Sequence, residues 1–248
     1  MRRPPPGPPR RSGSTGAGMI AAGLQKSSLI DYPGRLSCVI FLSGCNFTCP
    51  YCHNPELARG RYPERIGEET LLGFLSERAG FLDGVVITGG EPTLQAGLAD
   101  LCSAVRQLGL AVKLDTNGSR PDVLAELIDA RLIDYVAMDI KTVPARYDQP
   151  LCASHYAAPV EESIGRIMAA DLPYEFRTTC VRPFVDGPAV EEIARLISGA
   201  RRYILQTFRP ATVLDPNFAR RPDIAFDADE MRNLQQLAAP WVQTCTVR

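Results

Sequence analysis

Residues 37–54 read SCVIFLSGCNFTCPYCHN, and they join an apolar run of strand length to three closely spaced cysteines. The run at 37–43 has the length and the β-branched and aromatic content of one buried strand. Cys45, Cys49 and Cys52 follow it directly with the spacing CxxxCxxC. The rest of the chain must show which fold holds this strand and which chemistry the cysteines serve.

Apolar runs of strand length alternate with helical periodicity along the remaining chain. We expect strands at Ser37–Ser43, Gly84–Thr88, Ala111–Asp115, Tyr135–Ile140, Tyr174–Thr179 and Arg202–Gln206, and a closing strand at Trp241–Val247. We expect helices at Glu68–Arg78, Leu94–Leu108, Pro121–Ala130, Val160–Ala170, Pro188–Gly199 and Asp229–Leu237. Six strand–helix repeats predict a parallel α/β fold, either an open sheet or a complete or partial barrel. In both, functional residues lie at the carboxyl ends of strands.

The composition is that of a globular protein. Its 248 residues are 45% hydrophobic and 22% charged, which is enough for a substantial core. A net charge of -1 provides no overall positive field for nucleic acid. We find no apolar run of membrane-spanning length and no signal-peptide core, so we expect a cytoplasmic protein without a membrane partner. Residues 1–18 are poor in apolar side chains and are predicted to be a disordered tail, with Met19 as a possible native start and 19–248 as one folded domain.

The eight cysteines are unevenly distributed. Apart from the CxxxCxxC group, Cys38, Cys102, Cys152, Cys180 and Cys245 are scattered, and we expect them to be small buried hydrophobic residues. In a reducing compartment the clustered group indicates metal or redox chemistry instead.

The clustered cysteines admit several interpretations. Cys49 and Cys52 enclose a glutaredoxin-like Pro-Tyr pair, but no long helix follows them to lower a thiol pKa. Cys49 to His53 also spells a c-type haem attachment site, which would need an export route. A zinc ion held by the cysteines and His53 would need two adjacent ligands, Cys52 and His53. An iron–sulfur cluster held by three thiolates remains, and it leaves one iron open for a substrate.

Polar residues at three later strand ends could complete such a site. Gly89, Gly90 and Glu91 follow the strand at 84–88, where glycines permit close approach and a carboxylate can accept from an amine. The other two groups are Asp115, Thr116 and Asn117 after the next strand, and Asp139 with Lys141 after the one beyond it. A tight turn, an Asx-type turn and a structural ion pair would explain the same three groups.

The combined pattern resembles the radical S-adenosylmethionine superfamily, whose CxxxCxxC motif carries an aromatic residue before the third cysteine, here Tyr51. The resemblance implies a partial (β/α)6 TIM-type barrel and one [4Fe–4S] cluster with Cys45, Cys49 and Cys52 as metal ligands. It implies that the open iron chelates S-adenosylmethionine, which an electron from the cluster cleaves to methionine and a 5′-deoxyadenosyl radical. The cofactor-binding residues it implies are Tyr51, Gly89, Gly90, Glu91, Asp115, Thr116, Asn117, Asp139 and Lys141.

Residues Gly23–Leu57 resemble activating proteins for anaerobic ribonucleoside-triphosphate reductase and, more distantly, pyruvate formate-lyase activating enzymes. The implied reaction removes a glycine α-hydrogen from a glycyl-radical partner enzyme, with flavodoxin or ferredoxin as electron donor. Alternatives are another glycyl-radical partner such as pyruvate formate-lyase, a noncatalytic iron–sulfur electron-transfer protein, or a zinc-stabilised interaction module.

The sequence leaves the roles of several further residues open. Arg177, Thr178 and Gln206 could meet a cofactor or substrate, or serve only core hydrogen bonding. His53 could order the cysteine-containing loop, and His155 is expected to be exposed. The loop at 147–159 could help to admit the glycine-bearing segment of the partner.

Overall fold

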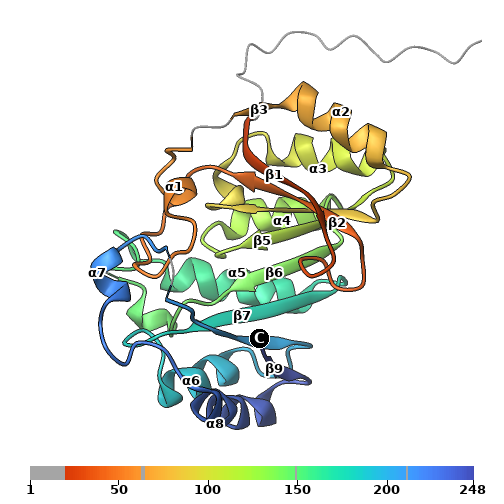
Figure 1. Cartoon of the computed structure of the whole chain (residues 1–248). Helices are drawn as coiled ribbons and strands as arrows, with labels where there is room; N and C mark the ends of the chain where they lie inside the picture. The colour runs from red at the N-terminus through yellow and green to blue at the C-terminus, as the bar shows by residue number, and fades with distance from the viewer. Residues whose placement is uncertain (1–19, 63–64, 149, 211) are drawn as a thin grey trace, which may run out of the picture.

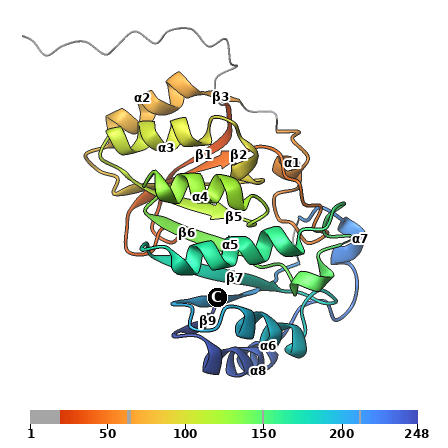
Figure 2. The same cartoon turned by 180° about the vertical axis from the view of Figure 1, so that it is seen from behind.

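A nine-stranded sheet with helices packed on its outer face forms the centre of the protein (Figures 1 and 2). The computed structural model describes residues 20–62, 65–148, 150–210 and 212–248. The strands are β1 (Ile20–Ser28), β2 (Ser37–Leu42), β3 (Ile66–Gly67), β4 (Gly84–Gly89), β5 (Ala111–Thr116), β6 (Tyr135–Asp139), β7 (Tyr174–Cys180), β8 (Tyr203–Thr207) and β9 (Cys245–Val247). The helices are α1 (Pro55–Ala58), α2 (Glu68–Arg78), α3 (Leu98–Gln107), α4 (Pro121–Asp129), α5 (Ala157–Ala169), α6 (Gly187–Leu196), α7 (Pro216–Ala219) and α8 (Ala228–Ala238). The predicted tail at 1–18 and the possible start at Met19 lie outside the described residues.

The sheet is mostly parallel and is not closed. Its strand order is β3-β1-β2-β4-β5-β6-β7-β8-β9, with every neighbouring pair from β2 onward parallel. Strands β1 and β3 extend it by antiparallel pairing at one edge. The predicted α/β fold with a partial barrel is therefore confirmed. The carboxyl ends of the parallel strands point to the edge where α1 and α7 lie, on the left in Figure 1.

Most predicted elements are present, with changed boundaries. The helix expected from Leu94 begins at Leu98, because Pro92–Leu94 forms a separate 3₁₀ turn. The closing strand expected at Trp241–Val247 is confined to Cys245–Val247, since Ala239–Trp241 is also a 3₁₀ turn. The helix at α8 begins with the capping box between Asp227 and Glu230 that its sequence suggests.

The core has two parts, one on each face of the sheet. The larger part fills the space between the sheet and the helices, which lie across the outer face in Figure 2. The smaller part lies on the inner face and contains Tyr32, Val39, Val86, Tyr135 and Ala137. The inner face therefore has little apolar packing of its own and becomes polar toward the carboxyl ends of the strands.

The scattered cysteines largely behave as expected. Cys38, Cys102, Cys152 and Cys180 are buried, while Cys245 is half-buried at the edge of the sheet. Among the described residues, no helix has the length and hydropathy needed to cross a bilayer.

Candidate active site

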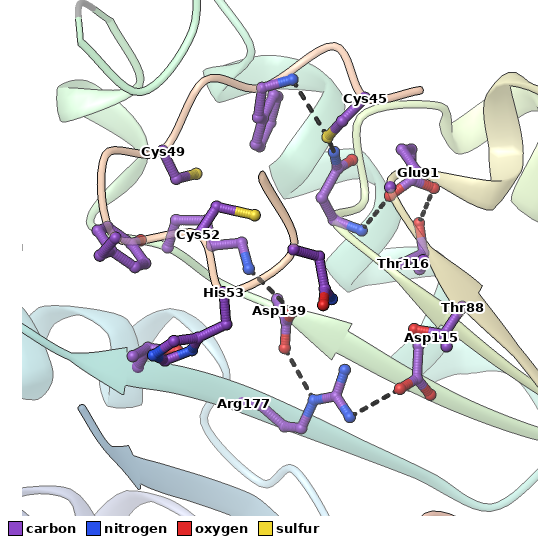
Figure 3. Close-up of a pocket in the computed structure, with 18 of the residues that line it drawn as sticks. Cys45, Cys49, Cys52, His53, Thr88, Glu91, Asp115, Thr116, Asp139 and Arg177 are labelled. Atoms are coloured by element: carbon purple, nitrogen blue, oxygen red, sulfur yellow. Dashed lines mark hydrogen bonds and ion pairs between the residues drawn. The ribbon is translucent and has the colours of Figure 1, made fainter. Parts of the chain in front are cut away.

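A cavity of about 290 Å³ opens at the carboxyl ends of the parallel strands (Figure 3). All of the predicted site residues line it: Cys45, Cys49, Tyr51, Cys52, Gly89, Gly90, Glu91, Asp115, Thr116, Asn117, Asp139 and Lys141. It is also lined by His53, Arg177 and Gln206, whose roles the sequence left open, and by Phe47, Asn54, Thr88 and Thr179, which were not predicted. Thr88 and Thr179 could have been found, because they lie near the ends of β4 and β7 as the other site residues do. Thr178 points away from the cavity and donates to the carbonyl of Ile140 at 2.8 Å.

The cysteine loop, residues 43–54, begins where β2 ends and is held first by α1. The main-chain N–H of Gly44 donates to Leu57 O at 2.7 Å, and that of Cys45 donates to Ala58 O at 3.1 Å. This short helix begins with proline at its first turn, which suits the missing N–H donor there. Figure 3 shows the three sulfur atoms projecting into the space that the loop encloses.

Two segments from later in the chain hold the other side of the cysteine loop. The N–H of Thr48 donates to Leu151 O at 2.7 Å, within the region 147–159. The N–H of Leu214 donates to Cys52 O at 3.0 Å, and the N–H of Asp215 donates to Pro50 O at 3.0 Å. The loop backbone therefore depends on contacts from three separate parts of the sequence.

The glycines after β4 allow its main chain to lie directly against the cysteine loop. A Cβ added to Gly89 would lie 2.2 Å from Leu42 O, and one added to Gly90 would lie 2.1 Å from Gly44 O. Gly89 also has φ +123, a conformation that residues with a Cβ rarely adopt. The close approach that these glycines permit is to the protein's own backbone.

The buried carboxylate of Glu91 links the segment after β4 to the end of β5. Its Oε1 accepts from the N–H and hydroxyl of Thr93 at 3.1 and 2.5 Å and from the hydroxyl of Thr116 at 2.7 Å, while Oε2 accepts from the N–H of Asn117 at 2.7 Å. Burial raises the pKa of this carboxyl, and these hydrogen bonds oppose that rise. Its predicted contact with an amino group stays a prediction, because the carboxylate is already occupied by four protein donors.

Five alternating charges cross the inner face from β5 to the end of β6. Lys113 pairs with Asp115, and Asp115 Oδ2 lies 3.0 Å from Arg177 Nη1. Arg177 Nε lies 2.8 Å from Asp139 Oδ1. Asp139 Oδ2 in turn lies 2.9 Å from Lys141 Nζ. We call this row the charge ladder. Burial alone would raise the pKa of Asp139, but Arg177 and Lys141 outweigh it and hold that pKa well below its usual range. The ladder has three cations and two anions, but Lys113 does not line the cavity, so two cations and two anions of the ladder face it.

In the cysteine loop Cys49 is buried, while Cys45 and Cys52 are half-buried. Burial raises the pKa of Cys45 to about 11 and that of Cys49 to about 12, and Lys141 acts in the opposite direction on both. The free thiols of Cys45 and Cys49 are therefore protonated at neutral pH, and a metal that binds them must displace their protons.

Tyr51 and His53 pack against aromatic side chains beside the cavity. The ring of Tyr51 lies 5.4 Å from Phe184 and 6.4 Å from Phe208 and Phe218, measured between centroids. Its hydroxyl is buried and has no hydrogen-bond partner among the described residues. His53 stacks on Phe208 at 5.5 Å, and its Nε2 lies 3.0 Å from the carbonyl oxygen of Arg209. Both side chains thus help to fix the loop, as suggested for His53.

The donor set fits a cluster better than a single ion. Within the part of the chain that the structure describes, no group of three His, Cys, Asp or Glu side chains is arranged to hold one metal ion. In a cubane each thiolate binds a different iron, so three ligands spaced around an enclosed volume are suitable. Cys45, Cys49 and Cys52 have this arrangement around the cavity.

Comparisons with known proteins agree with this geometry. Residues 39–198 match the Radical SAM superfamily. The chain belongs to the radical SAM superfamily. Members of this superfamily use a [4Fe–4S] cluster and S-adenosylmethionine, and these are the cofactors of this chain.

Named relatives narrow the family further. The chain is 34% identical over 238 residues to the "Putative glycyl-radical enzyme activating enzyme MJ1227" of Methanocaldococcus jannaschii, a match that covers 92% of this chain and 95% of that protein. It is 31% identical over 125 residues to the pyruvate formate-lyase-activating enzyme of Clostridium pasteurianum, covering 48% of this chain and 51% of that one. The chain is thus an enzyme of the radical SAM glycyl-radical activating family.

Solved structures share the fold. Streptococcus suis SuiB superposes with a TM-score of 0.66 at 14% identity, and the match covers 85% of this chain and 48% of SuiB. SuiB bound to S-adenosylmethionine gives a TM-score of 0.65 at 12% identity, covering 85% of this chain and 51% of that one. The chain therefore spans about half the length of these structures.

Gly90→Ala should destabilise the protein, because the new Cβ would meet Gly44 O at 2.1 Å and displace the start of the cysteine loop. Gly73→Ala is the matched control, since Gly73 lies inside α2 with open space around its Cβ position. We expect Gly90→Ala to lower the free energy of unfolding by roughly 2 kcal/mol or more, and Gly73→Ala to raise it by up to about 1 kcal/mol. Urea denaturation followed by circular dichroism measures both. Equal stabilities for the two variants would contradict the close main-chain contact.

Arg177→Met should destabilise the folded protein, because it leaves the carboxylates of Asp115 and Asp139 without their shared cationic partner. We expect the free energy of unfolding at pH 7 to fall by about 3 to 5 kcal/mol, against less than about 0.5 kcal/mol for Arg166→Met in the exposed pair with Glu162. Since the folded pKa of Asp139 is lowered, its stabilising effect is present above about pH 4 and is lost on further acidification. Urea titrations from pH 7 to pH 3 should therefore show the gap between wild type and Arg177→Met narrowing. A constant gap would mean that the ladder does not set this pKa.

Proposed function

We propose that the protein installs a glycyl radical on anaerobic ribonucleoside-triphosphate reductase by using S-adenosylmethionine at its [4Fe–4S] cluster. The observation that carries this proposal is the single cavity that unites the cysteine loop with the ends of β4, β5 and β6. An electron carrier or a zinc module would need only the cysteines. Polar residues from three further strand ends beside them are what a second, organic ligand requires.

The chain's own residues have distinct tasks in this proposal. Cys45, Cys49 and Cys52 hold the cluster, which supplies an electron to the sulfonium ligand when both are bound. The charge ladder ends at Lys141, whose ammonium group faces the cavity beside the cysteines and can attract a carboxylate. Tyr51 lines the cavity, and its buried hydroxyl has no hydrogen-bond partner among the described residues. Tyr51, Gly89, Gly90, Glu91, Asp115, Thr116, Asn117, Asp139 and Lys141 together form the proposed cofactor-binding set.

A second cavity next to the first favours a polypeptide as the substrate. This cavity of about 330 Å³ shares His53 and Asn54 with the first and is otherwise lined mainly by Phe41, Leu57 and Tyr62 and their neighbours. A glycine inside a chain brings flanking residues with it, and an adjoining partly apolar cavity offers room for them. Glycine itself has no side chain to obstruct access to its α-hydrogen.

The named relatives support the choice of partner only at the level of glycyl-radical enzymes. The resemblance of Gly23–Leu57 to activators of the reductase favours that partner over pyruvate formate-lyase. We further infer that flavodoxin or ferredoxin delivers the electron in the cytoplasm, because the sequence has no cysteine between Cys52 and Cys102 that could hold a second cluster nearby.

Replacement of any proposed ligand, Cys45→Ala, Cys49→Ala or Cys52→Ala, should abolish the cluster. The control is Cys102→Ala, because Cys102 is buried in α3 and does not line the cavity. After anaerobic reconstitution with iron and sulfide, we expect normal iron content and 5′-deoxyadenosine formation with dithionite in the control, and a loss of at least about 100-fold in product for the three ligand variants. A normal cluster in any of the three would refute its assignment as a ligand.

Incubation of the reconstituted protein with S-adenosylmethionine, reductant and each candidate partner tests the substrate. We expect the electron paramagnetic resonance signal of a glycyl radical on anaerobic ribonucleoside-triphosphate reductase, and none on pyruvate formate-lyase. A reductase variant with the target glycine replaced by alanine serves as control and should give no signal. A radical on pyruvate formate-lyase alone would reverse the assignment of the partner.

A further inference from the structure

Asn117 occupies a fixed position between β5 and the cysteine loop. The residue is only 6% exposed. Its main-chain N–H donates to Glu91 Oε2 at 2.7 Å, and its side-chain Oδ1 accepts from the N–H of Ser119 at 2.9 Å. The second contact identifies the oxygen end of the amide, because a main-chain N–H can only donate. The nitrogen end must then face the cysteine loop.

The Nδ2 group of Asn117 has two neighbours in that loop. It lies 3.0 Å from Asn46 Oδ1 and 3.9 Å from the sulfur of Cys45. Asn46 is held in turn, since its own Nδ2 donates to the hydroxyl of Ser119 at 2.8 Å. The amide nitrogen carries two hydrogens, and an oxygen and a sulfur both lie within hydrogen-bonding distance of it.

Cys45 differs in this respect from the other two cysteines of the loop. Its sulfur also lies 3.4 Å from the N–H of Phe47. Among the described residues, the sulfur of Cys49 meets only its own main-chain N–H, and the sulfur of Cys49 or Cys52 accepts no hydrogen bond from the N–H group of another residue. Two N–H donors thus converge on one of three thiols, in a region where burial strengthens electrostatic interactions.

We propose that Asn117 is a positioning residue that raises the reduction potential of the cluster by donating a hydrogen bond to the Cys45 thiolate. The inference rests on the proposed function to the extent that Cys45 is a cluster ligand. Reduction adds one electron and no proton, so the reduced cluster is more negative than the oxidised one. An N–H donor to a ligand sulfur stabilises the more negative state and makes reduction easier.

The test is a redox titration of the reconstituted protein, without partner, followed by the electron paramagnetic resonance signal of the reduced cluster. Asn117→Leu keeps the approximate side-chain size and removes the donor. We expect the ratio of reduced to oxidised cluster at a fixed potential to fall by roughly three- to tenfold, which corresponds to about 30 to 60 mV for a one-electron couple. Asn117→Asp should lower the ratio further, because a carboxylate oxygen replaces the amide nitrogen beside the sulfur.

Ser119→Ala is the matched control for the network. It removes the hydroxyl that accepts from Asn46 but keeps the main-chain N–H that orients Asn117. We expect its potential to equal that of wild type. If Asn117→Leu forms a normal cluster with an unchanged potential, the inference is overturned.

A second measurement uses the wild-type protein and does not depend on how the variants fold. Labelling asparagine with ¹⁵N should give a nitrogen coupling in pulsed electron paramagnetic resonance of the reduced cluster, and Ser119→Ala should retain it. The absence of any such coupling in wild type would also overturn the inference. A normal cluster in Cys45→Ala would do so as well, by removing the ligand. Failure to form a glycyl radical on the partner would not affect it, because neither readout involves the partner.

Discussion

The site depends on one main-chain contact, the pairing of the residues that follow β4 with those that follow β2. The N–H groups of Gly90 and Glu91 donate to the carbonyls of Leu42 and Gly44, both at 2.8 Å. These bonds continue the parallel ladder of β2 and β4 past the ends of both strands. The cysteine loop therefore starts as an extension of the sheet, and the rigid sheet fixes the position of its first residues.

Glu91 connects this main-chain contact to the end of β5. Once the main chain at Glu91 is tied to the cysteine loop, its carboxylate reaches Thr116 and Asn117 at the end of β5. Asn117 then extends back to Cys45 and Asn46. Hydrogen bonds thus connect the cysteine loop to residues 89–91, these residues to the end of β5, and the end of β5 back to the cysteine loop. A buried polar network stabilises a protein only if its polar groups are hydrogen-bonded. The carboxylate of Glu91 meets this condition, because it accepts four hydrogen bonds.

The strand ends could be predicted from sequence because they depend on local patterns. Apolar runs of five to seven residues followed by glycine or polar residues identify β2 and β4 to β8 without reference to any partner. Strand β1 was not predicted, because Ile20–Ser28 reads IAAGLQKSS, which is part polar and contains a glycine. Its strand conformation comes from antiparallel pairing with β2, which is a tertiary effect. The two four-residue helices α1 and α7 are likewise too short to give a periodic signal.

The same distinction between local patterns and tertiary effects applies to the site residues. The sequence predicted which positions lie at strand ends, but it did not predict the direction in which each side chain points. Glu91 appeared in sequence as a carboxylate available to a ligand, yet the structure gives it four protein donors. The sequence assigned Arg177 no single role, yet its guanidinium joins Asp115 of β5 to Asp139 of β6. Both outcomes depend on which residues the register places opposite each other, such as Asp139 beside Arg177.

The cysteine loop also requires chain that lies beyond the family match. That match ends at residue 198, whereas the N–H groups that bind the carbonyls of Pro50 and Cys52 belong to Asp215 and Leu214. The same later region supplies Phe208 and Phe218, which pack on Tyr51. Without it, two carbonyls of the cysteine loop would lose their donors, and a buried tyrosine would be exposed to water. The cover of the cysteine loop therefore extends through α7 and is not confined to the matched segment.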